Sequence, residues 1–306
     1  MKLLIDTDPG VDDALAILMA CQGAEVTGLT IAAGNVGLRH TVANALRLID
    51  LVGVDTPVFP GCAGPLVLPE ADAAFVHGAD GFGDTGYTRS TRQASSEHAA
   101  LAMIRLSREH AGQLVLVALA PLTNLALALR LDPSLPKRVQ RLVVMGGAAT
   151  GRGNTARVPA EFNIGFDPEA AHIVFSTWPE FELVDWEATL RHGLAYEDVE
   201  RWLAADSPRA RFYAAISRRT RSWARAHERE RMLAADALAM AVALDPDIVV
   251  SAQSCHVAVE LDGALTRGAT VVDWEGRMGK PANARIVLGV DQARFEALLG
   301  AALAAI

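Results

Sequence analysis

The stretch KLLIDTDPGVDDALAILMA, residues 2–20, carries four aspartates between two apolar segments. Residues 2–5 form a short, mostly apolar run of the kind found in buried strands, and the apolar side chains from Val11 onward recur at helical spacing. These two patterns predict a strand that is followed at once by a helix. The aspartates, at positions 6, 8, 12 and 13, fall at the junction between the two elements.

Local signals predict where each aspartate lies. Pro9 suits the first position of the helix, where the N–H that proline lacks would have no helical partner in any case. Asp8 then stands at the N-cap, where an aspartate side chain commonly accepts a backbone hydrogen bond. We expect Asp6 and Asp8 at the carboxyl end of the strand. The pair Asp12 and Asp13 is expected in the first helical turn.

Carboxylates this close repel one another unless one is protonated or a cation lies among them. Each aspartate alone is also explained by helix capping or by the helix dipole. The set as a whole, with no cysteine and no cluster of histidines nearby, favours a hard cation, Ca²⁺ or Mg²⁺.

Two known motifs resemble this stretch. An EF-hand loop that began at Asp6 would need an acidic or amide residue where Gly10 stands and a glutamate where Ile17 stands, so that motif is excluded. The DTD triplet also resembles the D-x-D signature of Mg²⁺-dependent phosphatases, in which Asp6 would be the nucleophile. That family has threonine or valine at the position of Gly10, and it gives the two later aspartates no role. The phosphatase is kept as an alternative.

Composition narrows the class of protein. The 306 residues are 51% hydrophobic, which is enough for a sizeable core, and the formal net charge of −8 argues against nucleic acid or an anionic membrane as a partner. Three cysteines show no paired or metal-binding spacing, which indicates a reducing compartment. No signal peptide and no membrane-spanning run is recognisable, so we expect a cytoplasmic protein.

Strand and helix patterns alternate along the first half of the chain. Strands are expected at residues 2–5, 25–33, 113–120, 141–147 and 181–185, and helices at residues 40–53, 96–112 and 167–177. Such alternation predicts an α/β fold with an open, mostly parallel, Rossmann-like sheet and helices on both faces. No linker or repeat interrupts residues 1–306, so we expect a single domain. Ligands of such folds bind at the carboxyl ends of the strands.

Further polar groups follow other predicted strands. Asn35 and the Leu119 carbonyl come directly after strands, and Asn154, Glu161 and Asn163 lie in a long loop after another. A carbonyl oxygen is a suitable Ca²⁺ ligand, and amide and carboxylate groups suit the hydroxyls of a sugar. For each of these residues alone, a turn or an ordinary surface loop is an equally good explanation.

The second half of the chain adds two features. Asp236 is an isolated carboxylate at the start of a strongly apolar helix, where it is either an N-cap or a further cation ligand. Residues 201–231 are helical in pattern and rich in arginine. Acidic residues interrupt this segment, so a solvated helical face is favoured over a nucleic-acid-binding patch.

Taken in order, these motifs resemble those of the inosine-uridine-preferring nucleoside hydrolases over nearly the whole chain. The matching stretches are DTDPGVDDA at 6–14, GN at 34–35, PLTNLA at 121–126, MGG at 145–147, AEFNIGFDPEAA at 160–171 and LTRGATVVD at 265–273. The resemblance implies a nucleoside hydrolase fold, a bound Ca²⁺ ion, a ribonucleoside substrate and a homodimer or homotetramer. Hydrolysis of the N-glycosidic bond would yield ribose and a free nucleobase.

The resemblance also implies roles for single residues. Asp8 corresponds to the base that activates water and to a metal ligand, and the other ligands are Asp13, the Leu119 carbonyl and Asp236. Contacts to the substrate or to metal-bound water are implied for Asp12, Asn35, Met145, Asn154, Glu161 and Asn163, and His77 is expected near the leaving base. Asp6 is expected to support the loop.

One position departs from the family pattern. Many members have histidine directly before the late metal-binding aspartate, where it protonates the leaving base, and this chain has Ala235. We therefore expect weak general-acid assistance, and faster cleavage of ribosides whose leaving group needs no proton. A non-catalytic protein that binds nucleosides or ribose is a third alternative, which absence of turnover would favour.

Overall fold

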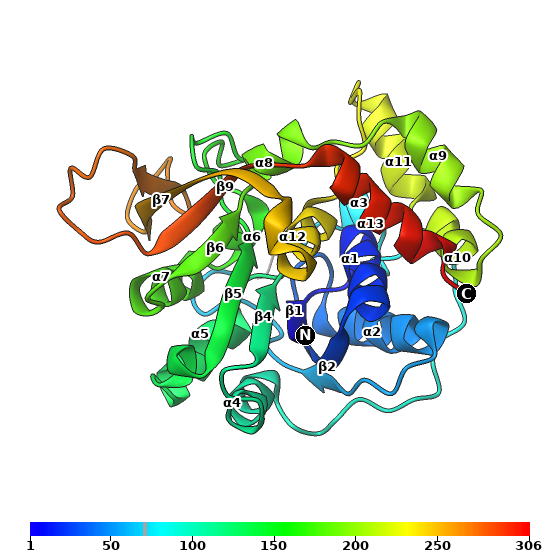
Figure 1. Cartoon of the computed structure of the whole chain (residues 1–306), viewed down its shortest axis with the longest axis horizontal. Coiled ribbons are helices and arrows are strands. Elements are labelled where there is room, and N and C mark those ends of the chain that lie inside the picture. The colour runs from blue at the N-terminus through cyan, green and yellow to red at the C-terminus, as the bar shows by residue number, and fades with distance from the viewer. Residues whose placement is uncertain (70–71) are drawn as a thin grey trace.

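The computed structural model describes residues 1–69 and 72–306, and its nine strands form one sheet (Figure 1). The strand order is β3-β2-β1-β4-β5-β6-β9-β7-β8. Pairing is parallel from β3 through β9, and the pairs β9–β7 and β7–β8 are antiparallel. The strands are β1 (Lys2–Thr7), β2 (Glu25–Ile31), β3 (Val58–Pro60), β4 (Leu114–Ala118), β5 (Val139–Met145), β6 (Phe181–Val184), β7 (Val249–Val259), β8 (Thr270–Asp273) and β9 (Ala284–Val290). The predicted mostly parallel α/β sheet is confirmed.

Helices cover both faces of this sheet, with α4, α5 and α7 on one side and α1, α12 and α13 on the other (Figure 1). The α-helices are α1 (Val11–Gly23), α2 (Leu38–Val52), α3 (Ala74–His77), α4 (Ala99–Glu109), α5 (Thr123–Leu131), α6 (Phe162–Phe166), α7 (Pro168–Thr177), α8 (Trp186–Arg191), α9 (Tyr196–Leu203), α10 (Pro208–Ile216), α11 (Arg218–Ala226), α12 (Ala235–Leu244) and α13 (Gln292–Ala304). Two short 3₁₀ helices span Leu135–Lys137 and Pro246–Ile248. In the described residues, no helix has both the length and the apolar character needed to span a membrane.

Successive residues of β1 contribute to different cores. Leu3 and Ile5 are buried in the cluster formed with α1 and α12, and Leu4 is buried in the cluster formed with α4 and α5. This follows from the two-residue period of a strand, which turns neighbouring side chains to opposite faces. Because helices cover both faces of the sheet, consecutive residues of β1 are apolar. The strand therefore lacks the alternation of apolar and polar residues that a half-exposed strand shows.

The start of α1 differs from the prediction. The helix begins at Val11 rather than at Pro9, and Gly10, not Asp8, occupies the N-cap position. The reason is that the Asp13 carboxylate accepts the Gly10 N–H at 2.9 Å, so the capping carboxylate comes from inside the helix. Asp8 Oδ2 instead accepts the Asn35 N–H at 2.6 Å. Asp12 and Asp13 do lie in the first turn, as predicted.

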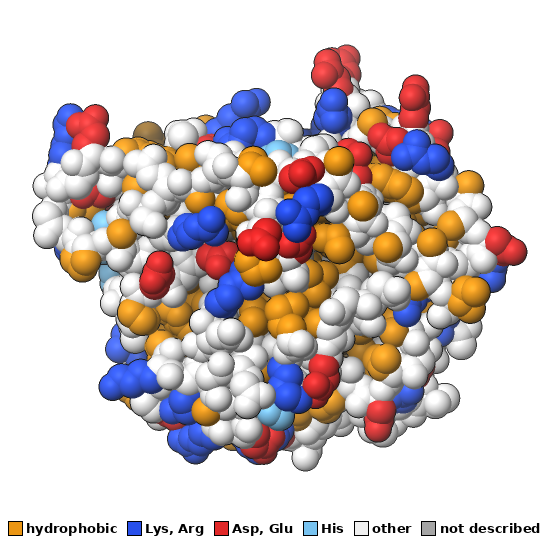
Figure 2. Space-filling model, in the orientation of Figure 1, with side chains coloured by type: hydrophobic (Ala, Val, Ile, Leu, Met, Phe, Trp, Pro, Cys, Tyr) orange, Lys and Arg blue, Asp and Glu red, His pale blue; other side chains and the backbone are white. Residues whose placement is uncertain are grey.

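The segment 201–231 forms parts of α9, α10 and α11, as its helical pattern predicts. Its outward arginines pair with acidic neighbours, for example Arg201 with Asp198 at 2.7 Å. Figure 2 shows basic and acidic side chains interspersed over the face that it presents. The predicted solvated face is wrong for Arg209, which is only 5% exposed, and for two arginines that line the pocket described below.

Arg141 on β5 connects the sheet to the end of α12. Its guanidinium makes two contacts of 3.0 Å with the Glu182 carboxylate on β6. It also donates to the carbonyls of Val242 and Ala243 at 3.1 Å, in the last turn of α12. These bonds satisfy helix carbonyls that would otherwise lack a partner. Since Asp236 lies in the first turn of α12, Arg141 helps to fix the helix that presents it.

We expect Arg141→Met to lower the free energy of unfolding by about 1–3 kcal/mol, because Glu182 and two carbonyls lose their donor. Urea denaturation of the purified protein measures this change. Arg130→Met is the matched control, since Arg130 is exposed at the end of α5. Equal midpoints for the two variants would contradict the anchoring role.

Candidate active site

A pocket of about 300 Å³ opens at the carboxyl ends of β1, β4 and β5. Two chemical groups make up most of its lining. The acidic and amide group comprises Asp8, Asp12, Asn35, Asn154, Glu161, Asn163 and Asp236. The largely aromatic and aliphatic group comprises Phe75, Val76, Phe162, Trp186, Trp223, Met232 and Leu233. The pocket thus offers polar contacts to one part of a ligand and apolar contacts to another.

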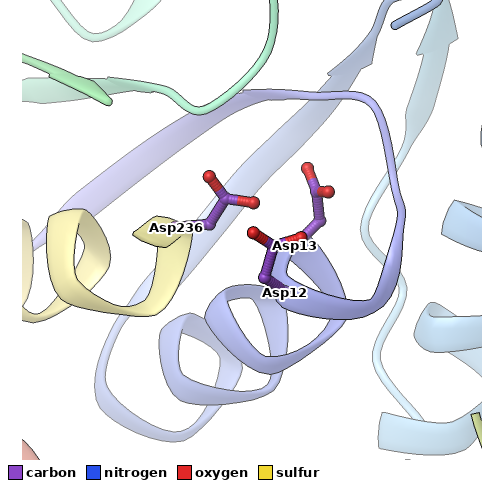
Figure 3. A group of neighbouring side chains, drawn as sticks. All are labelled: Asp12, Asp13 and Asp236. Carbon is purple, nitrogen blue, oxygen red and sulfur yellow. The ribbon is translucent and has the colours of Figure 1, made fainter. Parts of the chain in front are cut away.

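Carboxylates from two helices meet beside this pocket. Oxygen atoms of Asp12, Asp13 and Asp236 all lie within 4.8 Å of one another. Asp12 and Asp13 come from the first turn of α1 and Asp236 from the first turn of α12, and Figure 3 shows the three side chains converging. The two helices pack against each other, so residues more than 200 positions apart in the sequence share one site.

Burial makes this group of carboxylates costly to ionise. Burial raises the pKa of Asp8 well above its ordinary value, and the neighbouring Asp13 carboxylate raises it further. Burial likewise raises the pKa of Asp236 far above its ordinary value, and the charge of Asp12 adds to this effect. Asp12 Oδ1 is buried and has no hydrogen-bond partner among the described residues. Oxygen atoms alone, several of them anionic, form a donor set that fits a hard divalent cation.

The sequence-predicted ligands lie around this group. Asp8 and the residue Leu119 line the same pocket as Asp236. The Leu119 carbonyl accepts a hydrogen bond of 2.7 Å from Asn163 Nδ2. The sequence resemblance implies that Asp12 contacts substrate or metal-bound water. In the structure, Asp12 lies in the tight carboxylate group with Asp13 and Asp236, and Asp8 lies beside that group.

Asn35 organises the aspartates. Its N–H binds Asp8 Oδ2, and its Nδ2 donates to Asp13 Oδ2 at 2.9 Å and to the Asp8 carbonyl at 3.2 Å. This close packing requires small neighbours. A Cβ atom on Gly34 would lie 2.2 Å from Asp8 Oδ2, and one on Gly10 would lie 2.8 Å from Asn35 Nδ2. The GN pair therefore sets the orientation of Asp8.

His77 lines the pocket as a neutral side chain. Its Nδ1 accepts the Val11 N–H at 3.2 Å, so the proton of the neutral ring is on Nε2. Burial lowers the pKa of His77 to about 4, against the opposing influence of Asp13. His77 is thus a hydrogen-bond donor near neutral pH rather than a cationic acid. His227, in contrast, is exposed and stacks on Trp223 at a ring separation of 4.3 Å.

The loop after β5 supplies the remaining predicted contacts. Glu161 accepts the N–H groups of Gly147 at 2.9 Å and of Asn163 at 3.0 Å. Burial raises the pKa of Glu161 to about 7 in spite of these bonds. Met145 lies under the Asn163 amide, with its sulfur 3.4 Å from Nδ2. Asn154 is more exposed, and its side chain accepts the Phe162 N–H at 2.8 Å.

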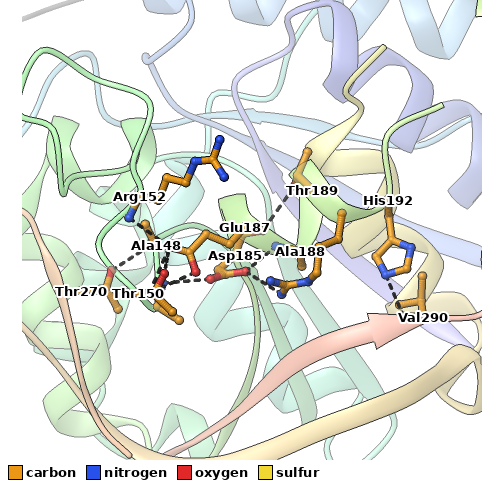
Figure 4. A network of polar contacts seen from close by, with 12 residues as sticks. Ala148, Thr150, Arg152, Asp185, Glu187, Ala188, Thr189, His192, Thr270 and Val290 are labelled. Carbon is orange, nitrogen blue, oxygen red and sulfur yellow. Dashed lines mark hydrogen bonds and ion pairs between the residues drawn. The ribbon is translucent and has the colours of Figure 1, made fainter. Parts of the chain in front are cut away.

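Two acidic residues that the sequence analysis did not single out hold this loop (Figure 4). Asp185 accepts the Ala149 N–H at 2.9 Å. Glu187 accepts the N–H groups of Thr150 and Arg152, each at 3.0 Å. Asp185 follows β6 directly, and Glu187 lies two residues later in the first turn of α8. Their position at the carboxyl end of a predicted strand, where Asp6 and Asp8 also stand, was the available signal.

Asp6 does not face the pocket, which removes the phosphatase alternative. Its side chain is fully buried, and its Oδ1 accepts hydrogen bonds from Thr30 at 2.8 Å and Asn124 at 2.9 Å. Burial raises the pKa of Asp6 to about 7. A nucleophile must reach its substrate, and this carboxyl group lies beneath the site instead. It connects β1 to β2 and α5, in line with the supporting role expected for it.

Comparison with known proteins agrees with this geometry. The model of the family described as inosine-uridine preferring nucleoside hydrolase matches residues 3–297. The chain is 37% identical over 297 residues to the non-specific ribonucleoside hydrolase RihC of Salmonella enteritidis, with 95% of this chain and 94% of that protein covered.

Solved structures are similar over the whole chain. A structure titled inosine-guanosine nucleoside hydrolase superposes with a TM-score of 0.93 at 34% identity and covers 100% of this chain and 99% of its own. The purine-preferring ribonucleoside hydrolase from Gardnerella vaginalis gives a TM-score of 0.90 at 31% identity, with 99% and 98% covered. The fold and these matches define an enzyme that hydrolyses N-glycosyl bonds. The chain belongs to the inosine-uridine preferring nucleoside hydrolase family, which confirms the resemblance seen in the sequence.

We expect Gly34→Ala to lower the melting temperature, because the added Cβ would overlap Asp8 Oδ2 and approach Pro121 Cδ to 2.9 Å. Overpacking of this kind typically destabilises a protein by about 1–3 kcal/mol. Gly37→Ala is the matched control from the same loop, since nothing lies within 4 Å of the Cβ position there. Differential scanning calorimetry compares the two, and a Gly34 variant as stable as the Gly37 variant would contradict the close approach.

Proposed function

We propose that this enzyme hydrolyses ribonucleosides to ribose and a free nucleobase, with Asp8 as the base that activates the attacking water. A Ca²⁺ ion would be held by Asp8, Asp13, the Leu119 carbonyl and Asp236. The observation that carries the proposal is the buried carboxylate group beside a pocket lined by amide, carboxylate and aromatic side chains. The names of the relatives, which act on several ribonucleosides, support the substrate class.

The donor set supports calcium. Carboxylate and carbonyl oxygens are ligands that Ca²⁺ prefers, and Asp12 Oδ1 offers a further buried oxygen without a partner among the described residues. When bound, the ion would supply the positive charge that the carboxylates lack and would lower the pKa of a coordinated water.

Asp8 is suited to accept a proton. Its side chain is 1% exposed yet lines the pocket, and the Asn35 N–H fixes its orientation. Burial raises the proton affinity of its carboxylate, which favours the transfer of a proton from water. The reaction needs no covalent enzyme intermediate, because water itself attacks C1′ of the ribose.

Other side chains act on the sugar. Cleavage of the N-ribosidic bond passes through an oxocarbenium-like state, which carries positive charge on the ring. Asp12 and Glu161 place carboxylate oxygens in this region, and Asn154 and Asn163 supply amide groups for hydroxyls. Charge placed in advance where charge develops lowers the barrier.

Two predictions from the sequence extend this proposal. A dimer or tetramer is expected by analogy with the family, and a scattering mass in solution tests it. A cytoplasmic location is expected from the cysteine content, and fractionation of the source cells tests it.

We expect Asp8→Asn to reduce the release of base from inosine and uridine by at least about 10³-fold, because the amide cannot accept the proton. Chromatographic assay of the free base measures this, with circular dichroism to confirm folding. Asp72→Asn, at an exposed position, is the control and should keep wild-type activity. Near wild-type turnover by the Asp8 variant would refute the mechanism, and binding of nucleosides without turnover by the wild type would favour a non-catalytic protein.

Removal of the metal provides a separate test. Dialysis against a Ca²⁺ chelator should abolish activity and lower the melting temperature, because the ion stabilises only the folded carboxylate group. Added Ca²⁺ should restore both properties. Elemental analysis of the untreated protein should find calcium, and a stoichiometric content of zinc alone would exclude the proposed ligand chemistry.

A further inference from the structure

Arg229 brings a positive charge to the aromatic part of the pocket. Its guanidinium carbon lies 5.8 Å from the ring centroid of Trp186 and 5.8 Å from that of Trp223, and all three residues line the pocket. Within residues 1–69 and 72–306, no side chain or carbonyl forms a hydrogen bond or ion pair with this guanidinium. Its N–H donors are therefore available to a ligand.

The backbone turns back to place this residue. Helix α11 ends at Ala226, and Glu228 adopts φ +54, a left-handed conformation that residues other than glycine rarely take. The Arg229 N–H then bonds to the Ala224 carbonyl at 3.1 Å. The turn follows α11 directly, and Arg229, Met232 and Leu233 after it line the pocket. Such conformations are concentrated at functional sites.

Neighbouring arginines are occupied elsewhere. Arg221 also lines the pocket, but it donates to Ser217 Oγ at 3.2 Å and to the Ala214 carbonyl at 3.1 Å, which ties it to α10. Arg225 covers the Tyr196 ring at 4.5 Å and pairs with Glu200. Arg229 thus differs from Arg221, the other arginine in the pocket lining, in having no hydrogen-bond or ion-pair partner among the described residues.

Ala235 offers no donor, and two other groups, His77 and Tyr213, fit the leaving base less well. His77 Nδ1 accepts the Val11 N–H at 3.2 Å, which leaves that ring a single N–H, whereas a guanidinium presents several. Tyr213 has a buried hydroxyl without a partner among the described residues, but the charges of Asp12 and Asp236 act on it, so it belongs to the acidic group. The flat, apolar faces of Trp186 and Trp223 suit a nucleobase, and the carboxylates suit the ribose.

We propose that the Arg229 guanidinium donates hydrogen bonds to acceptor atoms of the leaving nucleobase and stabilises the negative charge that the base acquires. The proposal rests on the hydrolysis proposed above. As the C1′–N bond breaks, its electron pair goes to the base nitrogen. The water oxygen bonds to C1′ and its proton passes to Asp8. The base anion then takes a proton from solvent, Asp8 releases one to solvent, and the products are ribose and the neutral base.

Arginine suits this task because its side chain stays charged at all physiological pH values and presents several donors in one plane. Two indole rings lie within cation–π distance of it, and an interaction with an anion is stronger beside such apolar surfaces than in open water. A fixed cation would thus supply by electrostatics what the absent histidine at position 235 would supply by proton transfer.

The test compares two substrates with calcium present. Inosine has a poor leaving group, whereas p-nitrophenyl β-D-ribofuranoside releases a stable anion. We expect Arg229→Met to lower kcat/KM for inosine by about 10²-fold or more. For the nitrophenyl riboside we expect a loss of less than about threefold, because that group leaves without assistance. Arg229→Lys should restore part of the activity on inosine, since it keeps the charge.

Arg218→Met is the matched control, because Arg218 is exposed on the same segment and does not line the pocket, and it should leave both rates unchanged. Equal losses on both substrates in the Arg229 variant would show a structural role and overturn the proposal. An unchanged rate on inosine would overturn it as well.

Binding of the free base gives a measurement that does not depend on turnover. Hypoxanthine should quench the fluorescence of the pocket tryptophans, and Arg229→Met should weaken its binding by about tenfold or more. If the wild type cleaved neither riboside, the proposed hydrolysis would be wrong. Unchanged hypoxanthine binding in the variant would separately refute the contact between Arg229 and the base.

Discussion

Mutual repulsion among buried carboxylates at the contact between α1 and α12 is the constraint on which the rest of this structure depends. Asp13 and Asp236 are almost fully buried, and Asp12 and Asp8 lie beside them. Burying such a group costs several kcal/mol per uncompensated charge, so the fold must provide compensation. Hydrogen bonds from Thr7, Gly10 and Asn35 to Asp13 provide part of it. A bound cation would provide the rest.

That constraint explains the loops around the site. Asn35 reaches the aspartates only because Gly34 and Gly10 leave room for it. The N-terminal turn of α1 is capped by Asp13 from within, which leaves Asp8 free to face the pocket. The same carboxylate therefore caps the start of the helix and joins the buried acidic group.

The opposite wall of the pocket follows a different principle. There the chain uses aromatic rings and arginines rather than carboxylates, and these come from α3, α6, α8, α11 and the residues that follow α11. The first turns of α1 and α12 and the loops after the strands supply the acidic group, while several short helices remote from one another in sequence supply the apolar one. The division matches the two halves of a nucleoside, a polar sugar and a flat base.

The sequence by itself determined the parallel α/β sheet, the position of the aspartates where β1 meets α1, and the resemblance to a known family. These properties depend on local patterns: the period of apolar residues, strand–helix alternation and short ordered motifs. The sequence predicted the ends of helices and strands less well. The carboxylate that caps α1 comes from Asp13 inside the helix, and strands β3 and β8 are too short to show a clear apolar period.

Only the tertiary structure decided which distant residues meet. The packing of α12 on α1 brings Asp236 to Asp12 and Asp13, and no local signal states that distance. The pattern of the arginine-rich segment predicts a solvated helical face. Apolar periodicity does not distinguish an arginine that points outward from one that lines the pocket after a left-handed residue. Glu228 has that left-handed conformation, and the Arg229 guanidinium after it lies near two tryptophan rings, one of which is more than 40 residues earlier in the chain. Such convergence depends on non-local packing, which a pattern of neighbouring residues does not encode.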